Sequence, residues 1–133
     1  MAIAKQISVI LNNRPGALAK ACSVLSENLV NMQAISVIEH NDHAVLRIIA
    51  DNPTKALLLL EQEGLMVLEQ NVVIAKMENS PGALTRIAQK LALADINVAY
   101  AYAAATENAS EALLVIRTDD LEKTNAMFSG IPS

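Results

Sequence analysis

The chain has very few aromatic residues, a single cysteine and no tryptophan. Its 133 residues include two tyrosines and one phenylalanine, so aromatic residues make up 2% of the sequence. Nucleic-acid-binding surfaces usually combine basic patches with stacking rings, whereas this chain is poor in rings and has a formal net charge of -4. A single cysteine excludes a disulfide scaffold within one chain. We therefore expect no nucleic-acid partner and no disulfide framework.

Long uninterrupted apolar runs are also missing, although hydrophobic residues make up 53% of the sequence and charged residues 18%. No stretch approaches the length needed to span a bilayer, and the N-terminal residues lack an apolar segment followed by a cleavage site. We expect a cytoplasmic protein without a membrane partner. This apolar composition predicts that apolar surface is buried between modules or subunits. We therefore expect at least a homodimer.

A short motif occurs twice and divides the chain. Asn-Arg-Pro-Gly-Ala-Leu at residues 13–18 returns as Asn-Ser-Pro-Gly-Ala-Leu at residues 79–84, at an offset of 66 residues. The repeat predicts two tandem modules, residues 1–70 and 71–133. Modules of this size bury little surface alone, so each should share a core or an interface with another unit.

Each copy of the motif is predicted to be the corner between a strand and a helix. Alternating apolar residues precede it, such as Ile7, Val9 and Leu11, and an apolar stripe at helical spacing follows it. The first of these helices is expected to end near Val30. Proline fixes φ at the helix start, and glycine lets the backbone come close to a ligand. The first helical N–H groups have no intrahelical acceptor, so the corner suits a carboxylate or another small anion. A well-made turn without a ligand is the alternative interpretation.

Both modules show the same order of expected elements: strand, helix, strand, strand, helix. In the first module the polar residues 69–71 are expected to separate two strands, 65–68 and 72–77. After Phe128 too few residues remain for a full last strand in the second module, and residues 1–6 or a neighbouring chain could cover that edge. The order predicts an α+β fold of two ferredoxin-like βαββαβ modules, each an antiparallel sheet with both helices on one face.

The corners, together with the residues that open the following strands, resemble the ACT domain family, whose members are small regulatory modules that bind amino acids. The matching stretches are residues 12–18 with 30–32, and residues 78–84 with 96–98. The resemblance implies a ligand at an interface between two modules, against the corner and the start of the second strand. The implied ligand-binding residues are Asn13, Gly16, Ala17, Leu18 and Asn31 in the first module, and Asn79, Gly82, Ala83, Leu84 and Asn97 in the second.

The function implied by this resemblance is non-enzymatic binding of a free amino acid, without a cofactor. Because Arg14 of the first motif is replaced by Ser80 in the second, we expect unequal affinities at the two sites. The resemblance also suggests a regulatory subunit of a separate biosynthetic enzyme, such as acetolactate synthase. A third hypothesis is an acyl phosphatase, because ferredoxin-like folds include these enzymes and Arg14 lies beside an unpaired helix start.

Other groups of polar residues are better explained by structure than by chemistry. His40 and His43 have a spacing compatible with a metal, but a hairpin turn does not easily supply a complete coordination shell, so we expect a solvated turn and no metal. Asp119 and Asp120 precede a helix, and capping accounts for them better than catalysis. Cys22 lies on an apolar helical stripe, where a small core residue is expected rather than a nucleophile.

Overall fold

Residues 2–129 are described by a computed structural model, in which the chain forms two compact units. The first module contains Lys5–Gln70. The second module contains residues 71–129 together with residues 2–4. Both modules combine helices with an antiparallel sheet, which confirms the predicted α+β fold of two ferredoxin-like units. No helix within residues 2–129 has the length and apolar character needed to cross a bilayer.

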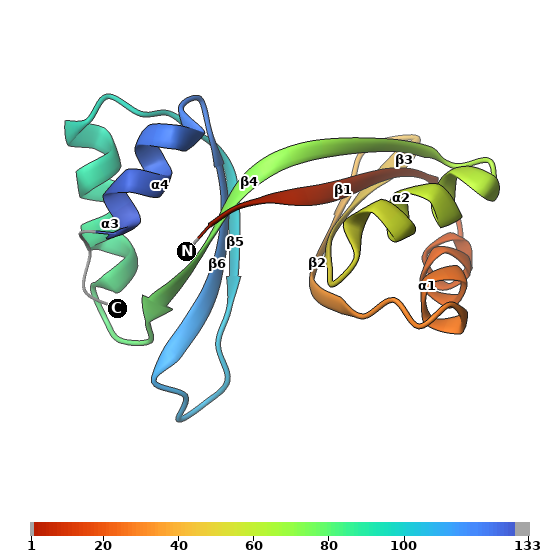
Figure 1. The fold of residues 1–133 in the computed structure, drawn as a ribbon, viewed down its shortest axis with the longest axis horizontal. Coiled ribbons are helices and arrows are strands. Elements are labelled where there is room, and N and C mark those ends of the chain that lie inside the picture. Colours follow the sequence, from red (N-terminus) through yellow and green to blue (C-terminus); the bar gives the residue numbers. More distant parts are fainter. Residues whose placement is uncertain (1, 130–133) are drawn as a thin grey trace. The chain divides into compact units, whose positions relative to one another are not determined.

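The first module follows the order strand, helix, strand, strand, helix, strand. Its elements are β1 (Ala2–Asn12), α1 (Ala17–Glu27), β2 (Met32–Glu39), β3 (His43–Ala50), α2 (Pro53–Gln62) and the beginning of β4 (Met66–Glu78). The strand order is β2-β3-β1-β4, and β3 is antiparallel to both β1 and β2. Helices α1 and α2 lie on the same face of this sheet (Figure 1).

The core of the first module lies between this sheet and its two helices. Alternate residues of β1 point into it, and Val9 lies opposite Leu46 of β3, so that both side chains are fully buried. Apolar residues at every second position of the strand and four-residue spacing on the helix are the two patterns that the sequence displays. The buried core residues are Ile7, Val9, Leu11, Ala21, Leu25, Val30, Ala44, Leu46, Ile48, Ala50, Ala56 and Leu60.

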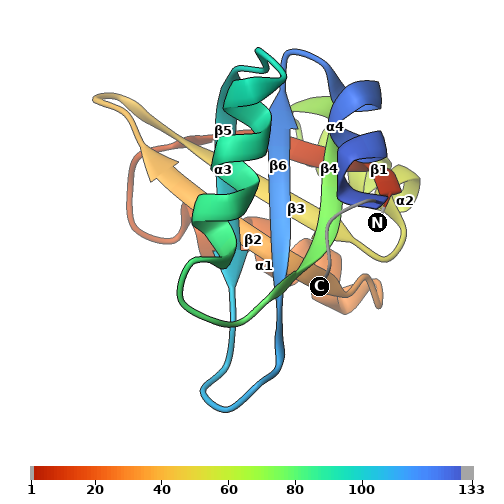
Figure 2. The same ribbon diagram turned by 90° about the vertical axis from the view of Figure 1, so that its left-hand side faces the viewer.

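The second module repeats this arrangement. It consists of the rest of β4, α3 (Ala83–Leu93), β5 (Val98–Ala104), β6 (Glu111–Thr118) and α4 (Leu121–Ser129), with the first residues of β1 beside β4. Figure 2 shows α3 and α4 in front of β5, β6 and β4, so the two helices again share one face of the sheet. The buried core residues are Val73, Ala75, Ile87, Leu91, Ile96, Leu114, Ile116 and Phe128.

The position of the missing last strand in the second module is taken by the chain's own N-terminal residues. Residues 2–4 of β1 group with the second module, and Ile3 packs against its core. β1 therefore contributes its first residues to one module and its remaining residues to the other. Of the stretch 1–6 that was expected to cover this edge, residue 1 lies outside the described residues, as do residues 130–133 at the other end.

Three local predictions were wrong. The polar residues 69–71 do not interrupt β4, because neighbouring groups satisfy them: Ser8 Oγ donates to Gln70 Oε1 at 3.4 Å, and Arg117 donates to the Asn71 carbonyl at 2.6 Å. The expected pair of strands is therefore one strand of 13 residues. Helix α1 ends at Glu27 rather than near residue 30, since Leu29 adopts a left-handed conformation with φ of 60°. The third error concerns the corners.

Candidate functional site

The first Pro-Gly corner is a β-turn that ends on the first residue of α1. The Ala17 N–H donates to the Arg14 carbonyl at 3.3 Å, with Pro15 and Gly16 at the centre of the turn. Gly16 has φ of 90° and ψ of -16°, which a type II turn requires at this place and which glycine adopts without strain. Pro15 was predicted at the helix start, but it belongs to the turn and the helix begins two residues later. Glycine is therefore needed for its positive φ.

Two backbone donors are left over at the start of α1. The Lys20 N–H donates to the Gly16 carbonyl at 3.0 Å, while the Ala17 N–H is used in the turn. Between them, the N–H groups of Leu18 and Ala19 meet no acceptor within residues 2–129. Such donors, at the positive end of the helix dipole, suit a carboxylate.

The second corner repeats this geometry at the start of α3. The Ala83 N–H donates to the Ser80 carbonyl at 3.3 Å, and Gly82 has φ of 88° and ψ of -10°. The N–H groups of Leu84 and Thr85 meet no acceptor in the described part of the chain. The repeat in the sequence is thus also a repeat of backbone geometry and of free donors.

The predicted site residues Asn31 and Asn97 are each held by an aspartate at the end of the third strand of their module. The Asn31 N–H donates to Asp51 Oδ1 at 3.1 Å, and the Asp51 N–H donates to the Asn31 carbonyl at 3.0 Å. Asn97 and Asp119 make the same pair of bonds, both at 3.1 Å. The side chains of the two asparagines are exposed. However, β1 reaches its corner beside His43, the first residue of β3, whereas Asn31 is bonded to Asp51 beyond the last residue of β3. The length of β6 separates the second corner from Asn97 in the same way, so the structure does not bring either asparagine to the corner of its own module.

This anchoring role of the two aspartates was not predicted from the sequence. Asp119 was assigned to a helix cap, but the residue that caps α4 is Asp120, whose Oδ1 accepts from the Lys123 N–H at 3.0 Å. The signal was present in the sequence. Aspartate follows the third strand of each module, at the same offset of 68 residues that relates the third strands.

The two corner asparagines, which were assigned the same role in ligand binding, have different surroundings. Asn79 Nδ2 donates to the Ala109 carbonyl at 2.8 Å and to the Thr106 carbonyl at 3.5 Å. The Asn79 N–H donates to the Ser110 carbonyl at 3.0 Å, so this residue ties the hairpin loop between β5 and β6 to the corner. The exposed Asn13 side chain makes no hydrogen bond within residues 2–129. Of these two corner asparagines, Asn13 is the one whose side-chain amide makes no hydrogen bond to the described residues.

Charge also differs between the corners. In the second module Arg86 forms an ion pair with Glu78 at 3.2 Å, and both side chains are about half exposed. Lys20 takes the place of Arg86 in the first module, where an asparagine replaces Glu78. Lys20 and Arg14 are exposed and have no ion-pair partner among the described residues. The first corner therefore has an uncompensated positive charge and the second does not.

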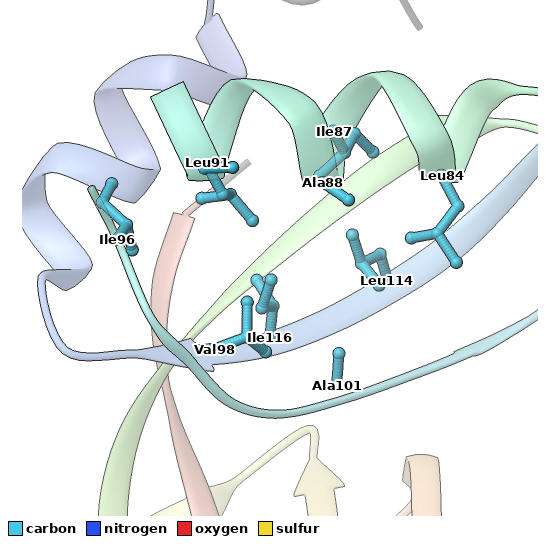
Figure 3. A pocket seen from close by; sticks show the side chains of 10 residues that line it. Leu84, Ile87, Ala88, Leu91, Ile96, Val98, Ala101, Leu114 and Ile116 are labelled. Atoms are coloured by element: carbon cyan, nitrogen blue, oxygen red, sulfur yellow. The ribbon is translucent and has the colours of Figure 1, made fainter. Parts of the chain in front are cut away.

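An apolar pocket of about 280 Å³ lies in the second module between α3 and the strands β5 and β6 (Figure 3). All ten residues that line it are aliphatic, and they include the predicted site residue Leu84. Leu91 of α3 and Leu114 of β6 are buried, whereas Leu84 and Val98 are 57% and 46% exposed. This pocket was not predicted from the sequence, although Leu84, one of the residues assigned to the site, lines it.

Groups that were set aside as unreactive have ordinary surroundings. The partly buried Cys22 thiol has a pKa raised by that burial, which lowers the fraction of reactive thiolate. His43 Nδ1 lies 2.8 Å from Asp42 Oδ1, and this hydrogen bond lowers the pKa of the Asp42 carboxyl. Within residues 2–129 no three His, Cys, Asp or Glu side chains cluster closely enough to hold a metal.

Comparison with known proteins gives one family and a set of structures with the same fold. The family model described as an ACT domain pair matches residues 1–129. Protein BT0572 from Bacteroides thetaiotaomicron is 30% identical with a TM-score of 0.90, and the alignment covers 96% of this chain and 88% of that protein. No curated protein matches the sequence.

Two further structures are more distant and share the fold. The regulatory subunit of aspartate kinase from Thermus thermophilus, in a ligand-free form, is 17% identical with a TM-score of 0.73, covering 98% of this chain and 97% of that one. The corresponding subunit from Thermus flavus is 18% identical with a TM-score of 0.66, covering 97% and 94%. Because the family model spans both repeats of the corner, strand and helix described above, the chain belongs to the ACT domain pair family, whose domains are regulatory modules.

Proposed function

We propose that this ACT domain pair binds a free amino acid at its Pro-Gly corners and has no catalytic activity. The observation that carries the proposal is the pair of free backbone donors at the start of α1 and again at the start of α3. A carboxylate accepts from Leu18 and Ala19 in the first module, and from Leu84 and Thr85 in the second. Two backbone N–H donors and the helix dipole favour this anion without a side-chain charge.

The asparagines supply the acceptors that an ammonium group needs. Asn31 and Asn97 open β2 and β5, and their backbones are fixed by Asp51 and Asp119. Asn13 and Asn79 each offer an amide oxygen, since the side-chain hydrogen bonds of Asn79 are donated by its Nδ2. Amide oxygens accept from ammonium N–H groups, so Asn13 and Asn79 supply the acceptors beside the corner of their own module. Asn31 and Asn97 lie at the other end of the third strand, and they reach a ligand at a corner only from a second copy of the chain. An α-amino acid carries both a carboxylate for the backbone donors and an ammonium group for the amide oxygens.

The two sites should differ in affinity. Arg14 and Lys20 give the first corner a positive field, whereas the Arg86–Glu78 pair leaves the second corner close to neutral. A net attraction for the carboxylate is therefore expected only at the first corner, and salt should screen it because both side chains are exposed. In the second module Asn79 must also hold its loop.

We further propose that the chain forms a homodimer. Strands β2 and β5 end the strand orders of their modules, and edge strands offer unpaired backbone groups to another chain. The large apolar side chains Ile35, Val37 and Ile38 of β2 are 47%, 47% and 41% exposed. A second copy would cover them and close the open side of the amino-acid site. A sedimentation coefficient of a monomer at micromolar concentration would rule out the dimer.

A regulatory subunit of a separate biosynthetic enzyme is the second candidate. Two structures with the same fold are described as regulatory subunits of aspartate kinase, and acetolactate synthase is the enzyme suggested by the family resemblance. In this role the chain works in the cytoplasm and transmits the amino-acid level to its partner. Purification of the tagged chain at native abundance separates the candidates, since a subunit retains one enzyme in stoichiometric amount and a free-standing sensor does not.

A thermal-shift screen of the twenty amino acids tests the proposed function. A ligand present at one hundred times its dissociation constant stabilises the folded state by about 2.7 kcal/mol, which is readily measured. We expect at least one amino acid to raise the melting temperature. Acetyl phosphate is included because Arg14 is exposed beside the free donors of α1. Its turnover by the wild type, lost in Arg14→Ala, would replace the binding proposal by an acyl phosphatase.

A further inference from the structure

We infer that the site in the second module selects an amino acid with an aliphatic side chain, which the pocket between α3 and β5 accommodates. This inference rests on the proposed function and adds the class of ligand. The pocket holds about 280 Å³, just below the usual range for drug-sized ligands, so it fits a molecule of amino-acid size.

The lining of the pocket decides which side chain it accepts. Every lining residue is aliphatic, and none offers a side-chain hydrogen-bond donor, an acceptor or a charge. A lysine or aspartate side chain would lose its hydration there without a partner, whereas an aliphatic side chain gains from leaving water. The cost of desolvation therefore makes the pocket select against amino acids with charged side chains.

The position of Leu84 connects the pocket to the donors at the corner. Its side chain lines one end of the pocket, with Ile96 at the other end (Figure 3), and its backbone N–H is one of the two free donors at the start of α3. The residue that opens the strand after Asn97 is Val98, whose side chain also lines the pocket. The proposed donor to the carboxylate thus lies at the Leu84 end of the space that receives the side chain.

The register of the strands shows why this space is present in the second module. Ala101 lies opposite Ile116 in β6, just as Ile35 lies opposite Ile48 in β3, so Ala101 and Ile35 hold equivalent positions. Ala88 is equivalent to Cys22 in the helices by the 66-residue offset. Val98 lies opposite Thr118 as Met32 lies opposite Ala50.

At all three positions the second module has the smaller side chain. The first module therefore has less room beside α1. For an aliphatic ligand, burial of its side chain should outweigh the salt-screened attraction of the exposed Arg14 and Lys20, so this ligand should occupy the second module first. Isoleucine at position 101 would restore the side chain of the first module and fill the space. Ala101 is exposed on an edge strand, where a β-branched residue is well tolerated.

Calorimetric titration with L-leucine, L-isoleucine, L-valine, glycine, L-lysine and L-aspartate tests the inference. Burial of a branched aliphatic side chain should make the leucine affinity about 10- to 150-fold higher than that of glycine. Ala101→Ile should weaken leucine binding at least about tenfold. Ala104→Ile is the matched control, because it adds the same side chain to the same strand opposite Leu113, on the other face from Leu114.

The outcomes separate this inference from the proposed function. If no amino acid binds, the proposed function fails and the inference fails with it. If glycine, lysine or aspartate binds as tightly as leucine, or if Ala101→Ile binds leucine like the wild type, the inference is overturned while amino-acid binding stands. Circular dichroism checks that each variant is folded, and Ala101→Val, which fills less of the pocket, replaces Ala101→Ile if that variant does not fold.

Discussion

The backbone N–H of Asn97 donates to Asp119 Oδ1 at 3.1 Å, and the backbone N–H of Asp119 returns a bond of 3.1 Å to the Asn97 carbonyl. Asn31 and Asp51 form the same reciprocal pair in the first module. In each module the second strand is thus clamped, just before its first residue, to the end of the third strand. Because the clamp is made by an aspartate carboxylate and three backbone groups, it fixes the backbone of the asparagine and does not use the side-chain amide of the asparagine.

Removing the carboxylate of this clamp should lower the stability of the folded chain. Asp119→Ala deletes the acceptor for the Asn97 N–H, and we expect the free energy of unfolding to fall by about 1 kcal/mol, because the bond is exposed to water. Asp119→Asn keeps an oxygen at this place and should lose less. Urea denaturation of the two variants checks this expectation, and equal losses would show that the bond contributes nothing.

The corner glycines are predicted to be required for their backbone conformation. A Cβ at residue 16 would meet no atom within 4 Å, so the effect of Gly16→Ala isolates the positive φ. We expect a loss of about 1 to 2 kcal/mol in the free energy of unfolding. Asn tolerates this conformation better than Ala, so Gly16→Asn should be milder. Unchanged urea midpoints for both variants would contradict the type II turn.

The N-terminal residues should stabilise the second module in particular. Ile3 packs partly buried against its core, and Ile3→Ala should destabilise that module by about 1 to 2 kcal/mol, less than for a fully buried isoleucine. Hydrogen exchange should accelerate along β6, while the amides of β2 keep their protection. Lys5→Ala is the control, because its 3.9 Å ion pair with Glu69 is exposed and worth little. Equal acceleration in both modules would show that Ile3 has no such local role.

The two corner asparagines should separate in a stability measurement. Asn79→Ala removes the donor to the Ala109 carbonyl and should reduce the free energy of unfolding by about 1 kcal/mol. Asn13→Ala deletes no hydrogen bond of the described residues and should unfold at the wild-type urea concentration. A loss of stability in Asn13→Ala equal to that in Asn79→Ala would mean that the two residues have the same structural role.

Much of the fold follows from short-range patterns in the sequence. Alternation at Ile7, Val9 and Leu11 fixes which face of β1 enters the core, and the repeated Pro-Gly corner fixes where each first helix begins to within two residues. The continuous β4 could not be predicted from its own residues. Gln70 and Asn71 look like a break, and what keeps them in a strand is bonding to Ser8 and Arg117, which are distant in the sequence.

The candidate site was predicted only in part, for a related reason. The motif identifies the corners and the asparagines. It does not predict that Asn79 donates a hydrogen bond to the β5–β6 loop while Asn13 makes no such bond. The pocket depends on the register between β5 and β6, because only that register places Ala101 opposite Ile116 beside α3. The sequence shows that the second repeat has smaller residues than the first at positions such as Ala101 and Val98. That these differences leave a pocket beside α3 follows only from the tertiary structure.

Calorimetric titration of the wild type and of the double variant Asn13→Ala/Asn79→Ala, with the amino acid that scores highest in the thermal-shift screen, tests the central claim most directly. Leaving the polar groups of the ligand unpaired should cost about 1 to 3 kcal/mol at each site, which weakens binding up to roughly a hundredfold. We expect saturable binding by the wild type and this loss in the folded double variant. Wild-type affinity in the double variant, or no heat with any of the twenty amino acids, would contradict the account and leave the Pro-Gly corners as turns alone.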